Sequence, residues 1–166
     1  SLQSFEKVTI EGNVAATILG TSAADTLTGD SGADVITGRG GADTLTGGSR
    51  SDTFVFATGD TGITEATADT ITDFSTGTDK IDVDAPGTYV EADGTNTADL
   101  AAFITNADAS LTTASDDIYA EYNFAGNGNT LVVIDENASA TVDAGDTLII
   151  LTGLSTAGGL DASDFI

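Results

Sequence analysis

Aspartate recurs in this chain at a spacing suited to binding metal ions. Asp25, Asp34, Asp43 and Asp52 follow one another at nine-residue intervals. Aspartate is a short carboxylate that favours turns and supplies the hard oxygen ligands that Ca²⁺ prefers. Carboxylates held close together repel one another, and a cation between them converts that repulsion into ligation. The spacing therefore predicts calcium sites at regularly repeated turns.

The elements that would position these aspartates follow from the same period. Residues 20–55 divide into the nonapeptides GTSAADTLT, GDSGADVIT, GRGGADTLT and GGSRSDTFV, each beginning with glycine. Glycine permits a tight turn at the start of each unit. The β-branched end of the unit, such as Thr26-Leu27-Thr28, suits a very short strand. One turn and one strand make half a coil, so two units predict one coil of two stacked parallel sheets.

The stacking in such a coil can be stated residue by residue. The eighth place of each unit is apolar, so we expect Leu27 to stack on Leu45 and Ile36 to stack on Phe54 inside the roll. The sixth places then bring Asp25 beside Asp43 at one edge, and Asp34 beside Asp52 at the other. A core this thin stabilises itself poorly by apolar burial alone, so bound ions must contribute.

These units resemble the glycine-rich nonapeptide G-G-x-G-x-D-x-U-x of RTX calcium-binding proteins. The resemblance implies a parallel β-roll that binds several Ca²⁺ ions between its turns and loses its fold without them. The ligands that it implies are glycines at the first and fourth places and the aspartates, namely Gly20, Asp25, Gly29, Gly32, Asp34, Gly38, Gly41, Asp43, Gly47 and Asp52. The outer units depart from the pattern at Ala23 and Arg50, so the resemblance supports ions at Asp34 and Asp43 better than ions at either end.

The resemblance continues over Phe54–Asp84, where RTX proteins often carry D-x-I-x-D-F and G-x-D-K-I-D. The apolar residues of this stretch are expected to cap the open end of the roll; they are Phe54, Val55, Phe56, Ile71, Phe74, Ile81 and Val83. Four of its aspartates are candidate ligands for a closing ion: Asp60, Asp69, Asp73 and Asp79. The alternative is that they are solvated turn carboxylates.

The last fifty residues predict a second β unit. Residues 118–124 and 130–135 flank an Asn-Gly turn and predict a β-hairpin, with a third strand over 147–154. The loop 135–146 resembles a degenerate EF-hand loop that lacks the glycine at its sixth place and the glutamate at its twelfth. Its candidate calcium ligands are Asp135, Asn137, Asp143 and Asp146, and the alternative is an acidic hairpin loop. Upstream, residues 99–104 predict one short helix in a connector.

The expected fold is therefore all-β, a parallel β-roll continued by a β-rich C-terminal region with at most one short helix. We expect N-terminal strands stacked on the roll over 1–19, the roll and its cap over 20–84, and a hairpin region over 85–166. The RTX resemblance implies a type I secretion signal in this last region. The ending DASDFI is similar to the endings of many type I secreted proteins.

Composition excludes several classes of function. The net charge is −23, with 4 basic residues against 27 acidic ones, so nucleic acids and anionic membrane surfaces are unsuited as partners. The absence of cysteine and histidine excludes thiol chemistry and histidine-based catalysis or zinc sites. No apolar run reaches the length of a transmembrane segment. A glycosidase carboxylate pair remains compatible with the composition, but nothing in the Asp-rich turns indicates one.

Two functions remain. The first is a calcium-binding, non-enzymatic C-terminal module of a secreted surface-layer or adhesin-type protein of a Gram-negative bacterium, with self-association in a surface lattice. The segment VDAGDTLIILTGL resembles the endings of alphaproteobacterial surface-layer proteins and favours this function. The alternative is the export and folding domain of a secreted enzyme, such as a serralysin-like protease or a lipase. Calcium ions and the type I secretion machinery are the expected partners in both.

Overall fold

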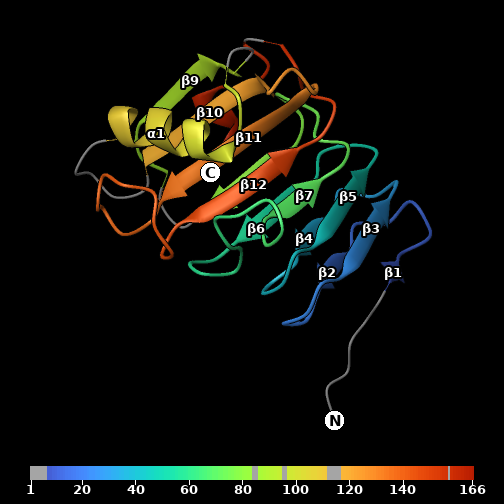
Figure 1. The fold of residues 1–166 in the computed structure, drawn as a ribbon. Coiled ribbons are helices and arrows are strands. Elements are labelled where there is room, and N and C mark those ends of the chain that lie inside the picture. The colour runs from blue at the N-terminus through green and yellow to red at the C-terminus, as the bar shows by residue number, and fades with distance from the viewer. Residues whose placement is uncertain (1–6, 84–85, 95–96, 112–116, 157) are drawn as a thin grey trace.

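The computed structural model describes residues 7–83, 86–94, 97–111, 117–156 and 158–166. Two sheets organise these residues, one with the strand order β1-β3-β5-β7-β12-β11-β10-β9 and one with the order β2-β4-β6-β8 (Figure 1). The strands are β1 (Val8–Thr9), β2 (Thr17–Leu19), β3 (Thr26–Asp30), β4 (Val35–Thr37), β5 (Thr44–Gly48), β6 (Thr53–Phe56), β7 (Asp69–Ile71), β8 (Lys80–Val83), β9 (Tyr89–Asp93), β10 (Asp117–Phe124), β11 (Asn129–Asp135) and β12 (Thr147–Leu151). Helix α1 spans Leu100–Ser110, and a short 3₁₀ helix spans Ala162–Asp164. Among the described residues, no helix has the length and apolar character needed to cross a bilayer.

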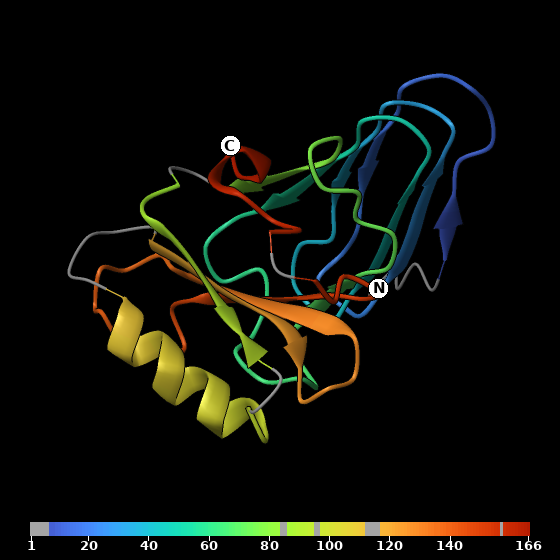
Figure 2. The ribbon, with the colours of Figure 1, turned by 90° about the horizontal axis from the view of Figure 1, so that it is seen from above.

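The nonapeptides form a parallel roll, as the sequence predicts. Successive strands alternate between the two sheets, and each pairs in parallel with the strand one full coil away (Figure 2). The registers Leu27↔Leu45 and Ile36↔Phe54 confirm the predicted stacking. All four of these side chains are fully buried between the sheets, because alternation along each short strand turns the eighth place inward.

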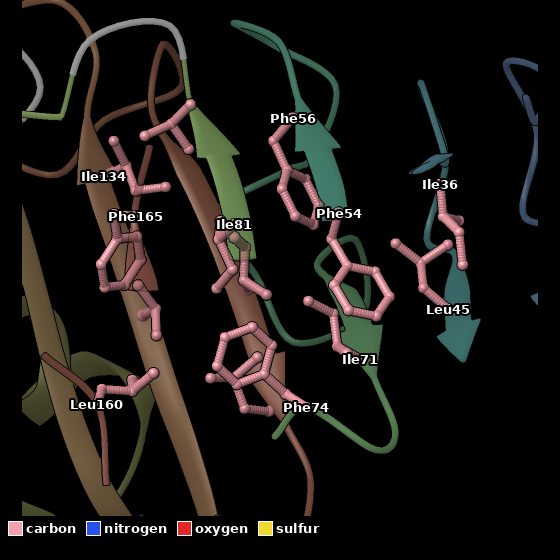
Figure 3. Close-up of a cluster of buried hydrophobic side chains, with 14 of the residues drawn as sticks. Ile36, Leu45, Phe54, Phe56, Ile71, Phe74, Ile81, Ile134, Leu160 and Phe165 are labelled. Carbon is pink, nitrogen blue, oxygen red and sulfur yellow. The ribbon is translucent and has the colours of Figure 1, made fainter. Parts of the chain in front are cut away.

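Strands β7 and β8 continue the roll beyond the nine-residue phase. Ile71 lies in register with Leu45, and Ile81 lies in register with Phe54. Figure 3 shows these side chains in one cluster with Phe74, which is also buried. The residues predicted for the cap are thus buried but belong to a further coil of the roll; the exception is Val55, which alternates outward between two buried phenylalanines and is only half-buried.

The C-terminal region is built onto the roll. The predicted hairpin is confirmed as the antiparallel pair β10 and β11, and β12 is the predicted third strand. Strand β12 also pairs in parallel with β7, with Ile149 opposite Asp69 and Leu151 opposite Ile71, so one sheet runs through both regions. Helix α1 covers the far part of this sheet, where the ring centroids of Phe103 and Tyr119 lie 5.6 Å apart.

Residues 165 and 166 pair with the outer edge of β8 in the smaller sheet. Phe165 makes a parallel bridge with Ile81 and is 3% exposed. The Ile166 amide donates to the Ile81 carbonyl at 3.0 Å, and the Val83 amide donates to the Ile166 carbonyl at 3.0 Å. The ring of Phe165 also contacts that of Tyr89, with centroids 5.6 Å apart. These contacts close the free edge of β8 in the folded protein.

Phe165→Ala is expected to destabilise the calcium-loaded protein by about 3–5 kcal/mol, the usual cost of truncating a buried phenylalanine. Ile166→Ala serves as its control, because that side chain is 50% exposed. Denaturant unfolding in saturating calcium measures both. Equal stability of the two variants would show that the packing of Phe165 contributes nothing to the fold.

Candidate calcium sites

The repeat aspartates lie where the chain bends between the two sheets, and successive coils connect them by hydrogen bonds. The Asp25 amide donates to Asp43 Oδ1 at 2.8 Å, and the Asp34 amide donates to Asp52 Oδ1 at 2.8 Å. All four side chains are 1–3% exposed. The predicted neighbours are therefore confirmed, and each carboxylate is buried beside the one a coil away.

Two aspartates beyond the nonapeptides extend these rows. The Asp43 amide donates to Asp69 Oδ1 at 2.8 Å, and the Asp52 amide donates to Asp79 Oδ1 at 3.0 Å. The first edge of the roll thus carries Asp25, Asp43 and Asp69, and the second edge carries Asp34, Asp52 and Asp79. In sequence, Asp69 and Asp79 fall outside the nine-residue phase, yet the structure places them in the same two rows, although Asp79 Oδ2 also accepts from the Ser75 amide.

One oxygen of most of these carboxylates has no hydrogen-bond partner although it is buried. These oxygens are Asp25 Oδ1, Asp34 Oδ2, Asp43 Oδ2, Asp52 Oδ2 and Asp69 Oδ2. A buried carboxylate oxygen without a partner is costly, and a cation is the partner that best offsets the cost. The unpartnered oxygens recur once per half coil, so the residues present fit a series of bound Ca²⁺ ions along both edges.

Burial also shifts the acidity of these groups. Desolvation raises the pKa of Asp43 to about 6 and that of Asp69 to about 8, against an opposing hydrogen bond from a backbone amide. Neighbouring carboxylates add to both shifts. The pKa values of Asp52 and Asp79 rise for the same first cause. These shifts describe the protein without its ions, and a bound cation would reverse them.

The glycine that opens each of the last three repeats leaves room for the unpartnered oxygen. A Cβ atom added to Gly29, Gly38 or Gly47 would collide with Oδ2 of the aspartate five residues later. At Gly29 it would also collide with the Gly47 carbonyl oxygen of the next coil. The space beside Asp34 is therefore bordered by a backbone oxygen, the second kind of ligand that calcium uses.

The other predicted glycines serve the close approach of the coils. A Cβ atom at Gly20 would collide with the Gly38 carbonyl oxygen, and one at Gly32 would lie 2.5 Å from the Val14 carbonyl oxygen. Gly41 has a φ of +124°, and a Cβ atom there would lie 2.6 Å from the Ala23 carbonyl carbon. Side chains at these places would separate neighbouring turns.

No three acidic side chains converge as a metal cluster anywhere in the residues that the structure describes. Each ion would therefore take one or two carboxylate oxygens and complete its shell with backbone carbonyl oxygens. Calcium accepts such flexible shells of six to eight oxygens, whereas Mg²⁺ requires a tighter octahedron and keeps its water. The arrangement can hold ions and thereby hold the coils together.

Asp60 and Asp73 lie beside the edges rather than in the two rows. Asp60 accepts a hydrogen bond from the Ala57 amide at 3.1 Å, and its charge contributes to the raised pKa of Asp69. Asp73 accepts from the amides of Gly47 and Gly48 at 2.9 and 2.7 Å. Neither accepts from the amide of a repeat aspartate, so neither belongs to the two rows.

The loop 135–146 uses its carboxylates on its own backbone. Asp135 is fully buried and accepts from the amides of Ser139 and Ala140 at 3.2 and 2.9 Å. Asp146 is fully buried and accepts from the amides of Glu136 and Asp143 at 3.3 and 2.7 Å. Desolvation raises the pKa of Asp146 to about 6.

The two remaining candidates of this loop, Asn137 and Asp143, are joined by a hydrogen bond of 2.9 Å between Asn137 Nδ2 and Asp143 Oδ1. Donors thus already occupy both oxygens of Asp135 and Asp146, the side-chain oxygen of Asn137 and one oxygen of Asp143. Calcium binding by this loop stays a prediction, and it would require these bonds to rearrange.

Asp164 is an acid of the second edge that the repeat phase does not reveal. Its side chain is 1% exposed, accepts from the Gly77 amide at 2.8 Å and lies 3.6 Å from Lys80 Nζ. Its charge contributes to the raised pKa of Asp79. The only local signal in the sequence is the placement of an acid directly before the two terminal apolar residues.

Comparison with known proteins agrees with this geometry. Residues 19–54 match the family model of the RTX calcium-binding nonapeptide repeat in four copies. A search of curated protein sequences gives no match. The chain is similar to the solution structure of the AlgE6R3 subunit of the Azotobacter vinelandii mannuronan C5-epimerase, with a TM-score of 0.61 and 25% identity, covering 99% of this chain and 80% of that one. The AlgE6R2 subunit of that epimerase gives a TM-score of 0.39 and 22% identity over 93% of this chain and 92% of its own.

The family model and the first of these structures support the same conclusion as the parallel registers and the unpartnered carboxylate oxygens. The chain is mostly β with parallel strands and one short helix. Residues 19–54 are RTX calcium-binding nonapeptide repeats, and they make this chain a calcium-binding β-roll module.

Proposed function

We propose that this module is the calcium-dependent, structural C-terminal part of a larger secreted protein of the surface-layer or adhesin type in a Gram-negative bacterium. The observation that carries the proposal is the row of buried, unpartnered aspartate oxygens along both edges of the roll. Such a row makes folding conditional on calcium, which is scarce in the cytosol and abundant outside the cell. The ions, with Asp25, Asp34, Asp43, Asp52, Asp69 and Asp79 as carboxylate ligands, assemble the roll after export through a type I system.

The alternative is the export and folding domain of a secreted enzyme. The likeness to a subunit of a mannuronan C5-epimerase favours this alternative, because that subunit accompanies an enzyme. In either case the module itself acts structurally, and any catalysis lies in another part of the parent protein.

Fractionation of the producing cells separates the two functions. The surface-layer or adhesin function predicts that the parent protein stays on the cell surface in calcium and is released by a chelator, with a lattice visible by electron microscopy in the surface-layer case. Recovery of the parent protein free in the medium, with an enzymatic activity and without surface retention, would refute it and favour the alternative.

The proposed secretion signal in residues 85–166 makes a separate prediction. Deleting residues 117–166 from the parent protein is expected to abolish export in cells with the cognate machinery. The roll of the truncated protein should still gain β structure on calcium addition, but with lower stability because β7 loses β12 and β8 loses Phe165. Normal levels of the truncated protein in the medium would show that the signal lies elsewhere.

A further inference from the structure

A buried carboxylate lies outside the roll, between α1 and the C-terminal part of the large sheet. Glu121 of β10 is 1% exposed. Its Oε1 atom accepts from the Tyr119 hydroxyl at 2.6 Å and from Asn106 Nδ2 of α1 at 2.7 Å. Its Oε2 atom is buried and has no hydrogen-bond partner. Half of this carboxylate is thus held by two neutral donors while the other half faces nothing that compensates its charge.

Other buried acids of the C-terminal region are stabilised differently. Asp117 accepts from the Thr88 amide at 2.9 Å, and Asp135 and Asp146 each accept from two backbone amides. Glu121 accepts only from a hydroxyl and a side-chain amide. Desolvation first, and the hydrogen bond to Glu121 second, raise the pKa of Tyr119, so the phenol keeps its proton and remains a donor.

No basic side chain is at hand to neutralise Glu121. The four basic residues of the chain are Lys7, Arg39, Arg50 and Lys80, so residues 81–166 contain neither lysine, arginine nor histidine. A proton on Oε2 would need an acceptor of its own, and the structure gives Oε2 no partner within hydrogen-bonding distance. A bound cation satisfies the oxygen and the charge together.

A glycine lies beside Oε2. A Cβ atom added to Gly94 would lie 3.2 Å from Glu121 Oε2 and 3.0 Å from the Tyr122 carbonyl oxygen. It would also lie 3.2 Å from Phe124 Cα, so only glycine lets the backbone pass this close to a carboxylate oxygen and a carbonyl oxygen; we call the place where Gly94 meets these two oxygens the notch. Thr97 is 6% exposed, and its hydroxyl lies 3.5 Å from Asn106 Nδ2, so a further oxygen belongs to the same buried group.

We propose that Glu121 binds a calcium ion in this notch, at a site separate from those of the roll. The donors are all hard oxygens, which suits Ca²⁺. One carboxylate with neutral oxygens gives a weak site, and a dissociation constant on the order of 10⁻⁴–10⁻³ M is typical of extracellular modules. The ion would tie the sheet to α1 through Asn106 and extend calcium dependence to the half of the chain that has no repeats.

Terbium luminescence can address this site selectively in the full chain. Tb³⁺ replaces Ca²⁺ and emits when a nearby tyrosine is excited, and the tyrosines of this chain are Tyr89, Tyr119 and Tyr122, all outside the repeats. We expect tyrosine-sensitised emission from the wild type that excess calcium displaces. Glu121→Gln, which keeps the shape and the Oε1 acceptor, is expected to lose most of this emission and to bind one calcium ion fewer by calorimetry.

Two matched variants control the experiment. Glu91→Gln removes the same charge from the neighbouring strand β9, where Glu91 pairs with Ala120, one residue from Glu121 in sequence. Tyr89→Phe removes the tyrosine that packs on Phe165 near the second edge. Both are expected to retain the emission and the full calcium stoichiometry.

Gly94→Ala provides an independent readout, because it fills the notch without changing a charge. It is expected to lose the same ion. The thermal stability of Glu121→Gln is expected to fall below wild type in calcium, and to exceed it at calcium concentrations that load the roll but not this weaker site. Unchanged emission and stoichiometry in Glu121→Gln and Gly94→Ala would overturn the proposal, as would loss of emission in Tyr89→Phe or loss of terbium emission without loss of a calcium ion.

Discussion

In excess chelator, the chain is expected to lose its parallel roll and to regain it cooperatively when Ca²⁺ is returned. Each buried, unpartnered oxygen costs about 1–3 kcal/mol. Five aspartates of the roll carry such an oxygen. Their combined cost is comparable to the whole stability of a typical domain, about 5–15 kcal/mol. The apolar core to which Leu27, Ile36, Leu45 and Phe54 belong must already offset the chain entropy lost on folding, so little of its stabilisation remains to offset this cost.

Circular dichroism and tryptic digestion, each with chelator and with restored calcium, measure this transition. Mg²⁺ at the same concentration serves as the control and is expected to restore little structure. A chelated protein with the spectrum and protease resistance of the calcium-loaded protein would contradict the prediction, because the aspartate rows would then be stable without ions.

The pKa shifts give the same transition a pH dependence. Burial raises the pKa of Asp69 from 3.8 to about 8 and that of Asp43 from 3.8 to about 6. A raised carboxyl pKa favours the folded state at low pH, and this contribution is lost as the pH rises from about 4 to about 8. Without calcium, the roll should therefore be more stable at pH 5 than at pH 8. Protons should also compete with calcium, so that more calcium is needed for folding at pH 5.

The roll could be predicted closely because its information is local and repeated. A fixed phase of glycine, aspartate and an apolar residue determines both the register and the pairing of Asp25 with Asp43. The phase breaks after residue 55, and it could not show that Asp69 and Asp79 occupy the same rows. The eight extra residues between Asp43 and Asp69, relative to two repeats, form a loop outside the stack rather than ending it.

Contacts between distant residues outside the repeats could not be predicted, because no repeating sequence pattern indicates them. Nothing in residues 147–151 indicates a parallel partner, yet β12 pairs with β7 and joins the hairpin region to the roll. The connector helix is longer than residues 99–104 suggest, because Phe103 and Ala107 lie on one buried face and extend it to Ser110. Asp108, an ordinary connector acid in sequence, accepts from the Val142 amide at 2.7 Å across that interface.

These contacts couple the two halves of the chain. Strand β12 pairs with the edge of β7, and Phe165 forms a backbone bridge with Ile81, so the C-terminal region completes its pairing only against a folded roll. If the C-terminus leaves the secretion channel first, the edges of its strands stay uncovered until residues 69–83 have also left the channel and folded against them. Calcium binding to the roll would then complete both halves in one step.

Gly38→Ala is expected to raise the calcium concentration at the folding midpoint about tenfold or more, a shift that corresponds to about 1.4 kcal/mol for each factor of ten. The added Cβ atom would collide with Asp43 Oδ2 and lie 3.0 Å from Asp43 Cγ, so the carboxylate must leave the place in which an ion would meet it. Overpacking of this kind costs about 1–3 kcal/mol.

Gly40→Ala, two residues later in the same turn, is the matched control. A Cβ atom there would meet nothing closer than 3.7 Å, at Ser22 Cα. Because alanine restricts the unfolded chain more than glycine, this variant is expected to be neutral or more stable by up to about 1 kcal/mol. Calcium titrations followed by circular dichroism compare the midpoints of the two variants. Coincident midpoints would mean that the oxygen of Asp43 lying against Gly38 takes no part in calcium binding, because only Gly38→Ala displaces it.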